Sequence, residues 1–259
     1  MNNIKIIFFD IDGTLIDLKK KEASEKTLEA LKKLRENGIK ICIATGRAPV
    51  EIPKFKGVEF DAYLSFNGSY CFDKKRIIVD HNMAAADVQT IIRNAAKLGR
   101  PVALSTEDRI EANGKDRDLV EYFAMGKQVI KISEDFEAFS EKKIYQIMTS
   151  CRREEYAQML EGTKNAEITA WWDRAVDIIP TNSGKGVAVS KVLEYYHILP
   201  REAMAFGDGN NDMEMLKTVG NGIAMGNASG ELKDIADAVC GSVEDEGVYE
   251  YCKKLGMIG

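Results

Sequence analysis

The chain has 259 residues, of which 45% are hydrophobic and 30% are charged, and its formal net charge is −5. This length accommodates one large domain or two modest ones, with enough apolar residues to bury a real core. The acidic, unpatterned charge balance argues against nucleic acid or an anionic membrane surface as the main partner.

The cysteines and the first residues indicate the compartment. Five widely spaced cysteines form no C-x-x-C pair, so they offer no zinc-site or disulfide framework and suit a reducing environment. The apolar run at residues 4–9 is cut off by Asp10 and Asp12, which makes it too short and too acidic for a signal peptide. No run in the sequence is long enough to span a bilayer. We therefore expect a soluble, cytoplasmic protein.

The first part of the chain predicts alternating strands and helices. Residues 4–9 form an apolar run apart from Lys5, which is typical of a strand buried on both faces of a parallel sheet. A helix with a leucine-rich side follows, and Asn37-Gly38 ends it. Further strands are predicted at 39–44 and 62–66. A strand, a helix and a strand joined by short links predict a right-handed parallel unit in an open α/β sheet.

The middle of the chain, from about residue 82 to 182, has a different pattern. Its predicted strands alternate between apolar and polar residues, and they lie at 128–133, 143–149 and 168–179, with helical segments at 85–98 and 152–161. This pattern predicts an inserted α+β domain with a mainly antiparallel sheet, so that the two ends of the chain form one core.

The last part returns to the pattern of the first. The predicted elements are helices at 186–196 and 212–218, strands at 203–206 and 222–225, and a final helix through Leu232 and Ile235.

The strongest chemical signal is Asp10-Ile11-Asp12-Gly13-Thr14, directly after the first strand. Residues two apart in an extended chain point the same way, so both carboxylates can face one pocket. They follow the carboxyl end of a parallel strand, where open α/β sheets bind ligands.

Two weaker signals suit an anionic group. Thr45, Gly46 and Arg47 close the second strand and offer a hydroxyl, exposed backbone N–H groups and a cation, although Arg47 equally suits a salt bridge. Lys185 stands between two glycines at the start of a helix, where an ammonium and a helix N-terminus could bind an anion together.

A further acidic cluster, Gly207-Asp208-Gly209-Asn210-Asn211-Asp212, follows a later strand. If the strand ends are neighbours, Asp10, Asp12 and Asp208 share one pocket, with Asp212 as a further candidate. Such crowding raises their pKa values or pushes the carboxylates apart. A hard divalent cation resolves this conflict, and oxygen ligands with water suit Mg²⁺. The expected ligands are the side chains of Asp10 and Asp208 and the backbone carbonyl of Asp12.

This ordered set resembles the haloacid dehalogenase superfamily over nearly the whole chain. The D-x-D-G-T motif of that superfamily matches Asp10 to Thr14, its threonine matches Thr45, its lysine matches Lys185, and its G-D-x-x-N-D motif matches Gly207 to Asp212.

The insertion between the threonine and the lysine resembles a C2 cap, and its mixed strand–helix pattern is most similar to the C2B caps of Cof-type sugar-phosphate phosphatases. The resemblance implies a Rossmann-like parallel-sheet core of residues 1–81 and 183–259, with a C2B-type cap of residues 82–182. It also implies a Mg²⁺-dependent phosphatase for small phosphorylated metabolites.

The resemblance also assigns roles. Asp10 would be the nucleophile that forms an aspartyl-phosphate, and Asp12 would protonate the leaving oxygen and later activate water. Asp212 would support the metal site or Lys185 from behind. The residues that would hold the transferring phosphoryl group are Thr45, Gly46, Lys185 and Asn211.

Several alternatives stay open at this stage. A phosphomutase of the same superfamily would return the phosphoryl group to its substrate, and a non-enzymatic phospho-acceptor or a binding module would not turn over at all. Sugar phosphates lead as substrates, with flavin and pyridoxal phosphates next. Asn67-Gly68 is predicted as a turn near the pocket, and residues 171–174 are predicted on a cap strand.

Overall fold

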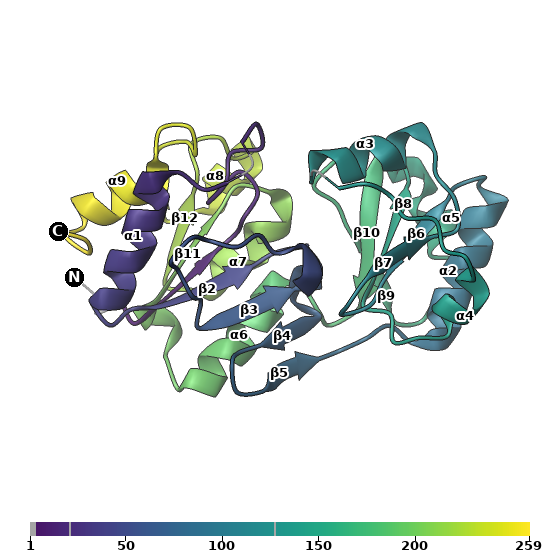
Figure 1. Cartoon of the computed structure of the whole chain (residues 1–259), viewed down its shortest axis with the longest axis horizontal. Helices are drawn as coiled ribbons and strands as arrows, with labels where there is room; N and C mark the ends of the chain where they lie inside the picture. The colour runs from purple at the N-terminus through teal and green to yellow at the C-terminus, as the bar shows by residue number, and fades with distance from the viewer. Residues whose placement is uncertain (1–3, 21, 127) are drawn as a thin grey trace. The chain divides into compact units, whose positions relative to one another are not determined.

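The computed structural model describes residues 4–20, 22–126 and 128–259. Its chain divides into two compact units (Figure 1). The first unit contains the described residues up to Thr45, together with Pro53–Val79 and Gly184–Gly259, and the second contains Gly46–Ile52 and Asp80–Ser183. The second unit therefore extends two residues beyond 82–182 at its start and one at its end, and it also takes Gly46–Ile52, which the sequence analysis assigned to the core.

The first unit is built on an eight-stranded sheet in the order β13-β12-β11-β1-β2-β3-β4-β5. The sheet is parallel from β13 to β3, and β4 then runs antiparallel to β3. The strands are β1 (Ile6–Phe9), β2 (Lys40–Ala44), β3 (Ala62–Ser65), β4 (Tyr70–Phe72), β5 (Ile77–Asp80), β11 (Ala203–Gly207), β12 (Asn221–Ala224) and β13 (Ala238–Val239). All residues of β1 and β11 are buried, which explains their continuously apolar sequences.

Helices cover both faces of this sheet. They are α1 (Glu25–Glu36), α6 (Lys185–Tyr196), α7 (Met213–Thr218), α8 (Gly230–Ile235) and α9 (Gly247–Lys254). Ile6 and Phe8 of β1 pack with α6 and α7 in one core cluster. On the other face, the Phe206 ring of β11 lies 5.8 Å from the ring of Tyr251 of α9, and α9 lies beside α1 (Figure 1). The predicted α/β class with a parallel-sheet core is confirmed.

The second unit contains a five-stranded antiparallel sheet in the order β7-β6-β8-β10-β9. The strands are β6 (Val102–Ser105), β7 (Ile110–Ala112), β8 (Gln146–Ser150), β9 (Ala166–Thr169) and β10 (Ala175–Pro180). One face packs on α2 (Ala85–Lys97), α4 (Phe136–Ser140) and α5 (Tyr156–Met159), and the other packs on α3 (Arg117–Met125). This arrangement is the α+β insertion that the sequence predicts.

One strand prediction in this unit is wrong, and another is confirmed at its two ends but interrupted in the middle. In place of a strand at 128–133, the described residues make an isolated bridge between Ala112 and Ile132. Val129 is 90% exposed, whereas Ile130 is partly buried against the core that includes α3. The segment 168–179 is a hairpin of β9 and β10, and residues 171–174 form its turn. The Trp172 ring in this turn lies 4.1 Å from the Arg174 guanidinium and 6.3 Å from the ring of Tyr122.

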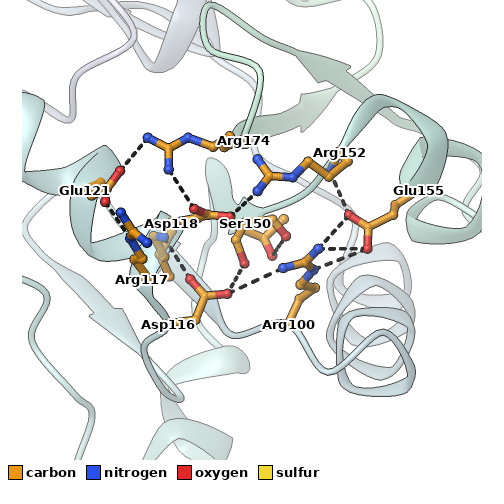
Figure 2. Close-up of polar contacts among 11 residues, drawn as sticks. Arg100, Asp116, Arg117, Asp118, Glu121, Ser150, Arg152, Glu155 and Arg174 are labelled. Carbon is orange, nitrogen blue, oxygen red and sulfur yellow. Dashed lines mark hydrogen bonds and ion pairs between the residues drawn. The ribbon is translucent and has the colours of Figure 1, made fainter.

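A network of ion pairs surrounds the start of α3 (Figure 2). Asp118, in the first turn, accepts hydrogen bonds from Arg152 at 2.6 Å and from Arg174 at 3.1 Å. Asp116 caps the helix by accepting from the N–H of Leu119 at 2.8 Å. Further pairs join Arg174 and Arg117 to Glu121, and Arg100 to Glu155 and Asp116. None of the helices in the described ranges is long and apolar enough to cross a membrane.

Candidate active site

The site begins where β1 ends. Asp10 is buried, and its backbone N–H donates to the carbonyl of Phe206 at the neighbouring strand end, 3.0 Å away. The chain then turns at Gly13, whose φ of +85° is unfavourable for other residues. A side chain there would also place its Cβ 2.1 Å from Asp208 Oδ2, so glycine lets the backbone approach that carboxylate. Thr14 Oγ1 donates to Asp208 Oδ1 at 3.1 Å.

Lys185 joins the two acidic motifs. It is the first residue of α6, and its side chain is fully buried. Its ammonium donates to Asp10 Oδ1 and to Asp212 Oδ1, each at 2.6 Å. The other carboxylate oxygen of Asp212 accepts from the N–H groups of Asp208 and Gly209, each at 3.0 Å. Asp212 therefore holds both the lysine and the loop that carries Asp208.

The electrostatics of the cluster favour a bound cation. Burial raises the pKa of Asp10 to about 7, against the attraction of Lys185, and the charges of Asp212 and Asp12 raise it further. Burial, followed by the charges of Asp10 and Asp212, raises the pKa of Asp208 to about 8. The ammonium of Lys185 loses hydration on burial, but its two carboxylate partners raise its pKa above the ordinary value. The single positive charge of Lys185 therefore does not balance the negative charges of these carboxylates.

The donor set fits a hard divalent ion. One carboxylate oxygen from each of Asp10, Asp208 and Asp212 lies within 4.8 Å of the others. Oxygen-only ligands suit Mg²⁺, and a divalent charge would favour the ionised form of the carboxylates whose pKa burial raises. The sequence analysis named Asp12 rather than Asp212 as the third ligand, through its backbone carbonyl. Asp12 lies close enough to Asp10 to raise the pKa of that carboxyl.

The predicted phosphate-binding residues follow other strand ends. Thr45 is buried after β2, and its N–H donates to the carbonyl of Leu64 at 2.8 Å. Its own carbonyl accepts from the N–H of Asn67, 2.9 Å away. The Asn67 side-chain oxygen accepts from Asn211 Nδ2 at 3.0 Å. The structure thus links Thr45 and Asn211 through Asn67, while Gly46 belongs to the second unit.

Asn227 is a site residue that the sequence analysis missed. It follows β12, and its Nδ2 donates to the carbonyl of Gly13 at 2.9 Å and to Asp208 Oδ2 at 3.3 Å. Its Oδ1 accepts from the N–H of Val243 at 2.9 Å. The sequence could have indicated Asn227. Because β12 is the parallel neighbour of β11, a polar residue after the carboxyl end of β12 lies next to Asp208.

The second unit contains a separate cavity of about 470 Å³. Its lining combines polar side chains with apolar ones and consists of Arg47, Val50, Glu51, Ile110, Phe123, Gly126, Gln128 and Val129. Arg47 donates to the carbonyl of Glu51 at 3.0 Å, and the Glu51 carboxylate accepts from the N–H of Ala48 at 3.1 Å. Burial raises the pKa of Glu51 to about 7, although the Ala48 N–H and the Arg47 charge favour its ionised form.

Comparison with known proteins agrees with this geometry. A family model described as haloacid dehalogenase-like hydrolase matches residues 7–252. YkrA of Bacillus subtilis, a protein named as a phosphatase, is 31% identical over 98% of this chain and 98% of its own length. The HMP-PP phosphatase of Yersinia pseudotuberculosis is 26% identical over 95% of this chain and 93% of its own.

A solved structure extends the similarity to the whole fold. The sugar phosphatase BT4131, of subclass IIB, superposes with a TM-score of 0.88 at 29% identity, covering 98% of this chain and all of the other. The match covers nearly all residues of both units. This chain therefore belongs to the haloacid dehalogenase-like hydrolases of the Cof type, and it is a phosphatase.

Proposed function

We propose that the protein is a Mg²⁺-dependent phosphatase that hydrolyses small phosphorylated metabolites, sugar phosphates first among them, through an aspartyl-phosphate on Asp10. The observation that carries this proposal is the buried cluster in which Lys185 bonds both Asp10 and Asp212, with the carboxylate of Asp208 beside them. A nucleophilic carboxylate held by an ammonium, next to a site for a divalent cation, is suited to phosphoryl transfer.

The first step would transfer the phosphoryl group to the protein. An oxygen of Asp10 attacks phosphorus, the bond from phosphorus to the leaving oxygen breaks, and Asp12 gives that oxygen a proton. Thr45, Lys185 and Asn211 would hold the equatorial oxygens. The dephosphorylated alcohol then leaves.

The second step would return the enzyme to its starting state. Asp12, now ionised, takes a proton from water, and the water oxygen attacks phosphorus. The bond between phosphorus and Asp10 breaks, which releases inorganic phosphate and regenerates the Asp10 carboxylate. One water is consumed for each phosphate released.

Mg²⁺ would be held by Asp10 and Asp208 and by the backbone carbonyl of Asp12, with Asp212 behind them. When bound, the ion supplies positive charge that offsets the negative charge of the phosphoryl oxygens. Asn227 would keep the Asp208 carboxylate and the Gly13 carbonyl in place around it.

The substrate class is supported by similarity to named relatives. BT4131 is named a sugar phosphatase, and it is similar to this chain over both units. Another relative is named for HMP-PP, so phosphorylated metabolites other than sugars belong in any test.

The test is phosphate release from a panel of hexose and pentose phosphates, flavin mononucleotide, pyridoxal phosphate and HMP-PP, with Mg²⁺ and with excess chelator. We expect Mg²⁺-dependent release, fastest from a sugar phosphate. Equal release in chelator would contradict the metal assignment. Rearrangement of a sugar phosphate without net release, stimulated by a bisphosphorylated sugar, would show a phosphomutase instead.

A further inference from the structure

The turn after β3 has an unfavourable backbone conformation. Phe66 and Asn67 both have a φ of +52°, in the left-handed region that residues other than glycine rarely adopt. Both side chains are buried, Phe66 at 0% and Asn67 at 1% exposure. Such conformations cost on the order of 1 kcal/mol or more each, and they persist where the surroundings hold them. The contacts of this turn show what holds it.

The turn contacts three elements that carry predicted phosphoryl-binding residues. Its Asn67 N–H bonds the carbonyl of Thr45, and its Asn67 side chain bonds Asn211. Gly68 packs against the start of α6, since a Cβ there would lie 2.6 Å from the carbonyl oxygen of Gly184, the residue before Lys185. The turn therefore lies at the junction of the Thr45, Lys185 and Asn211 segments.

A hydrogen bond holds the nitrogen of the Asn211 carboxamide, and its oxygen lies close to the backbone of Gly209. The Asn211 Nδ2 donates to Asn67 Oδ1 at 3.0 Å. The Asn211 Oδ1 lies against Gly209, where a Cβ would be only 2.6 Å away. A carboxamide is planar and has two N–H donors, so fixing one of them sets the direction of the other. Without such contacts the amide turns freely about its last torsion.

We propose that Asn67 is a positioning residue for phosphoryl transfer: it accepts one N–H of Asn211 and thereby directs the second N–H at the transferring phosphoryl group. This inference rests on the proposed function, in which Asn211 binds that group. A donor oriented before the reaction stabilises developing charge without reorganising, and loss of one such donor costs roughly 10²- to 10³-fold in kcat. Asn67, which acts through Asn211, should account for part of that effect.

A purely structural explanation makes a different prediction. Asparagine tolerates the left-handed region better than most residues, and glycine tolerates it better still. If Asn67 served only the turn, Asn67→Gly would preserve the fold, the backbone bond to Thr45 and the activity. If it orients Asn211, the same substitution lowers kcat while the fold stays intact.

The experiment measures steady-state phosphate release with Mg²⁺ for the wild type, Asn67→Gly, Asn211→Ala and the double variant, with thermal unfolding of each. Asn67→Ala is measured beside them. It removes the same carboxamide, but alanine tolerates a positive φ less well than glycine. We expect Asn67→Gly and Asn67→Ala to lower kcat by about 10-fold or more, with KM changed far less. In the Asn211→Ala background, Asn67→Gly should have no further effect, because residues that act as a unit are not additive.

His197→Gly is the control, because His197 is an exposed residue with a φ of +54° at the end of α6. It should leave kcat unchanged. Wild-type kcat in Asn67→Gly, or losses that multiply in the double variant, would overturn the positioning role alone. Absence of release by the wild type would overturn the proposed function and this inference with it.

Discussion

Lys185 shows why single residues matter most at this site. Its buried ammonium neutralises part of the charge of Asp10 and Asp212, each 2.6 Å away. Breaking a buried ion pair from one side costs about 3 to 5 kcal/mol, because a charge is left without a partner. Removing the lysine would therefore damage the fold as well as the chemistry. Replacing Asp10 by a neutral residue avoids this cost, because the Lys185 ammonium still pairs with the Asp212 carboxylate.

Asp10→Asn tests the nucleophile. We expect the variant to lose activity by roughly 10³-fold or more, as nucleophile deletions do in other enzymes. Its free energy of unfolding should stay within about 1 kcal/mol of the wild type, because the amide still accepts from Lys185 and no charge has to be buried. Phosphate release and urea unfolding measure the two effects. Asp234→Asn, on the exposed side of α8, is the matched control. Near-normal turnover in Asp10→Asn would contradict the assignment.

Glu51 gives a pH-dependent prediction in the second unit. Its pKa is about 7 in the fold and 4.5 ordinarily, so the native state holds the proton more tightly than the unfolded chain. The free energy of unfolding therefore falls as pH rises from about 4.5 to about 7, by up to about 3 kcal/mol. Glu51→Gln has no proton to lose and should be more stable than the wild type above pH 7.

Urea unfolding at pH 5.5 and pH 8 measures this difference. Glu107→Gln, an exposed substitution in the same unit, should keep the pH dependence of the wild type. If Glu51→Gln also kept it, the high pKa of Glu51 would be refuted.

At the scale of elements, α3 depends on its first turn for its position in the second unit. Its apolar residues pack on one face of the sheet, while Asp118 pairs with Arg152 after β8 and with Arg174 before β10 (Figure 2). Asp118 is only 13% exposed, so these pairs are less screened than surface pairs. Carboxylates in a first helical turn also interact favourably with the helix dipole.

Asp118→Asn should therefore lower the free energy of unfolding by about 1 to 2 kcal/mol, mostly in the second unit. Arg117→Gln is the control from the same network. Its side chain is 86% exposed and pairs with Glu121 one helical turn away, so its effect should stay within about 0.5 kcal/mol. Chemical denaturation compares them. Equal effects of the two substitutions would show that burial does not strengthen the Asp118 pairs.

At the scale of the whole molecule, the acidic cluster lies entirely in the first unit. Asp10, Asp208 and Asp212 all belong to it, whereas the cavity at Arg47 and Glu51 belongs to the second. Burial raises the pKa of Asp10 to about 7 and that of Asp208 to about 8, so the metal-free protein loses stability as pH rises from about 4 toward 8. A cation must displace these protons, and it binds more tightly as pH rises.

Mg²⁺ should thus stabilise the metal-free protein more at pH 8 than at pH 6. An ion at 100 times its Kd contributes about 2.7 kcal/mol. Thermal unfolding measures the stabilisation, and hydrogen exchange should slow at the ends of β1 and β11 but not in the second unit. Asp208→Asn should remove most of the shift. A Mg²⁺ effect confined to the second unit would place the ion elsewhere.

Most of the fold prediction rested on residue patterns within single strands and helices. The apolar runs at β1, β2 and β11 and the leucine side of α1 are signals within one element, so they predict it without knowledge of its neighbours. The predictions for 128–133 and 168–179 failed, wholly or in part, because contacts with the rest of the fold decided the structure there. Their alternation suits a strand, but Val129 is 90% exposed, and Trp172 lies near Tyr122, a residue distant in sequence.

The sequence by itself determined the fold class, the inserted α+β unit and the motifs that follow the parallel strands. These depend on the spacing of apolar residues along the chain and on the side of a strand to which neighbouring side chains point. Only the tertiary structure decided that Lys185 bonds Asp10 and Asp212, that Asn67 joins Thr45 to Asn211, and that Asn227 reaches Asp208. Hydrogen bonds between residues as far apart as 175 positions depend on strand order and on the exact paths of the loops, and neither is encoded in a local pattern.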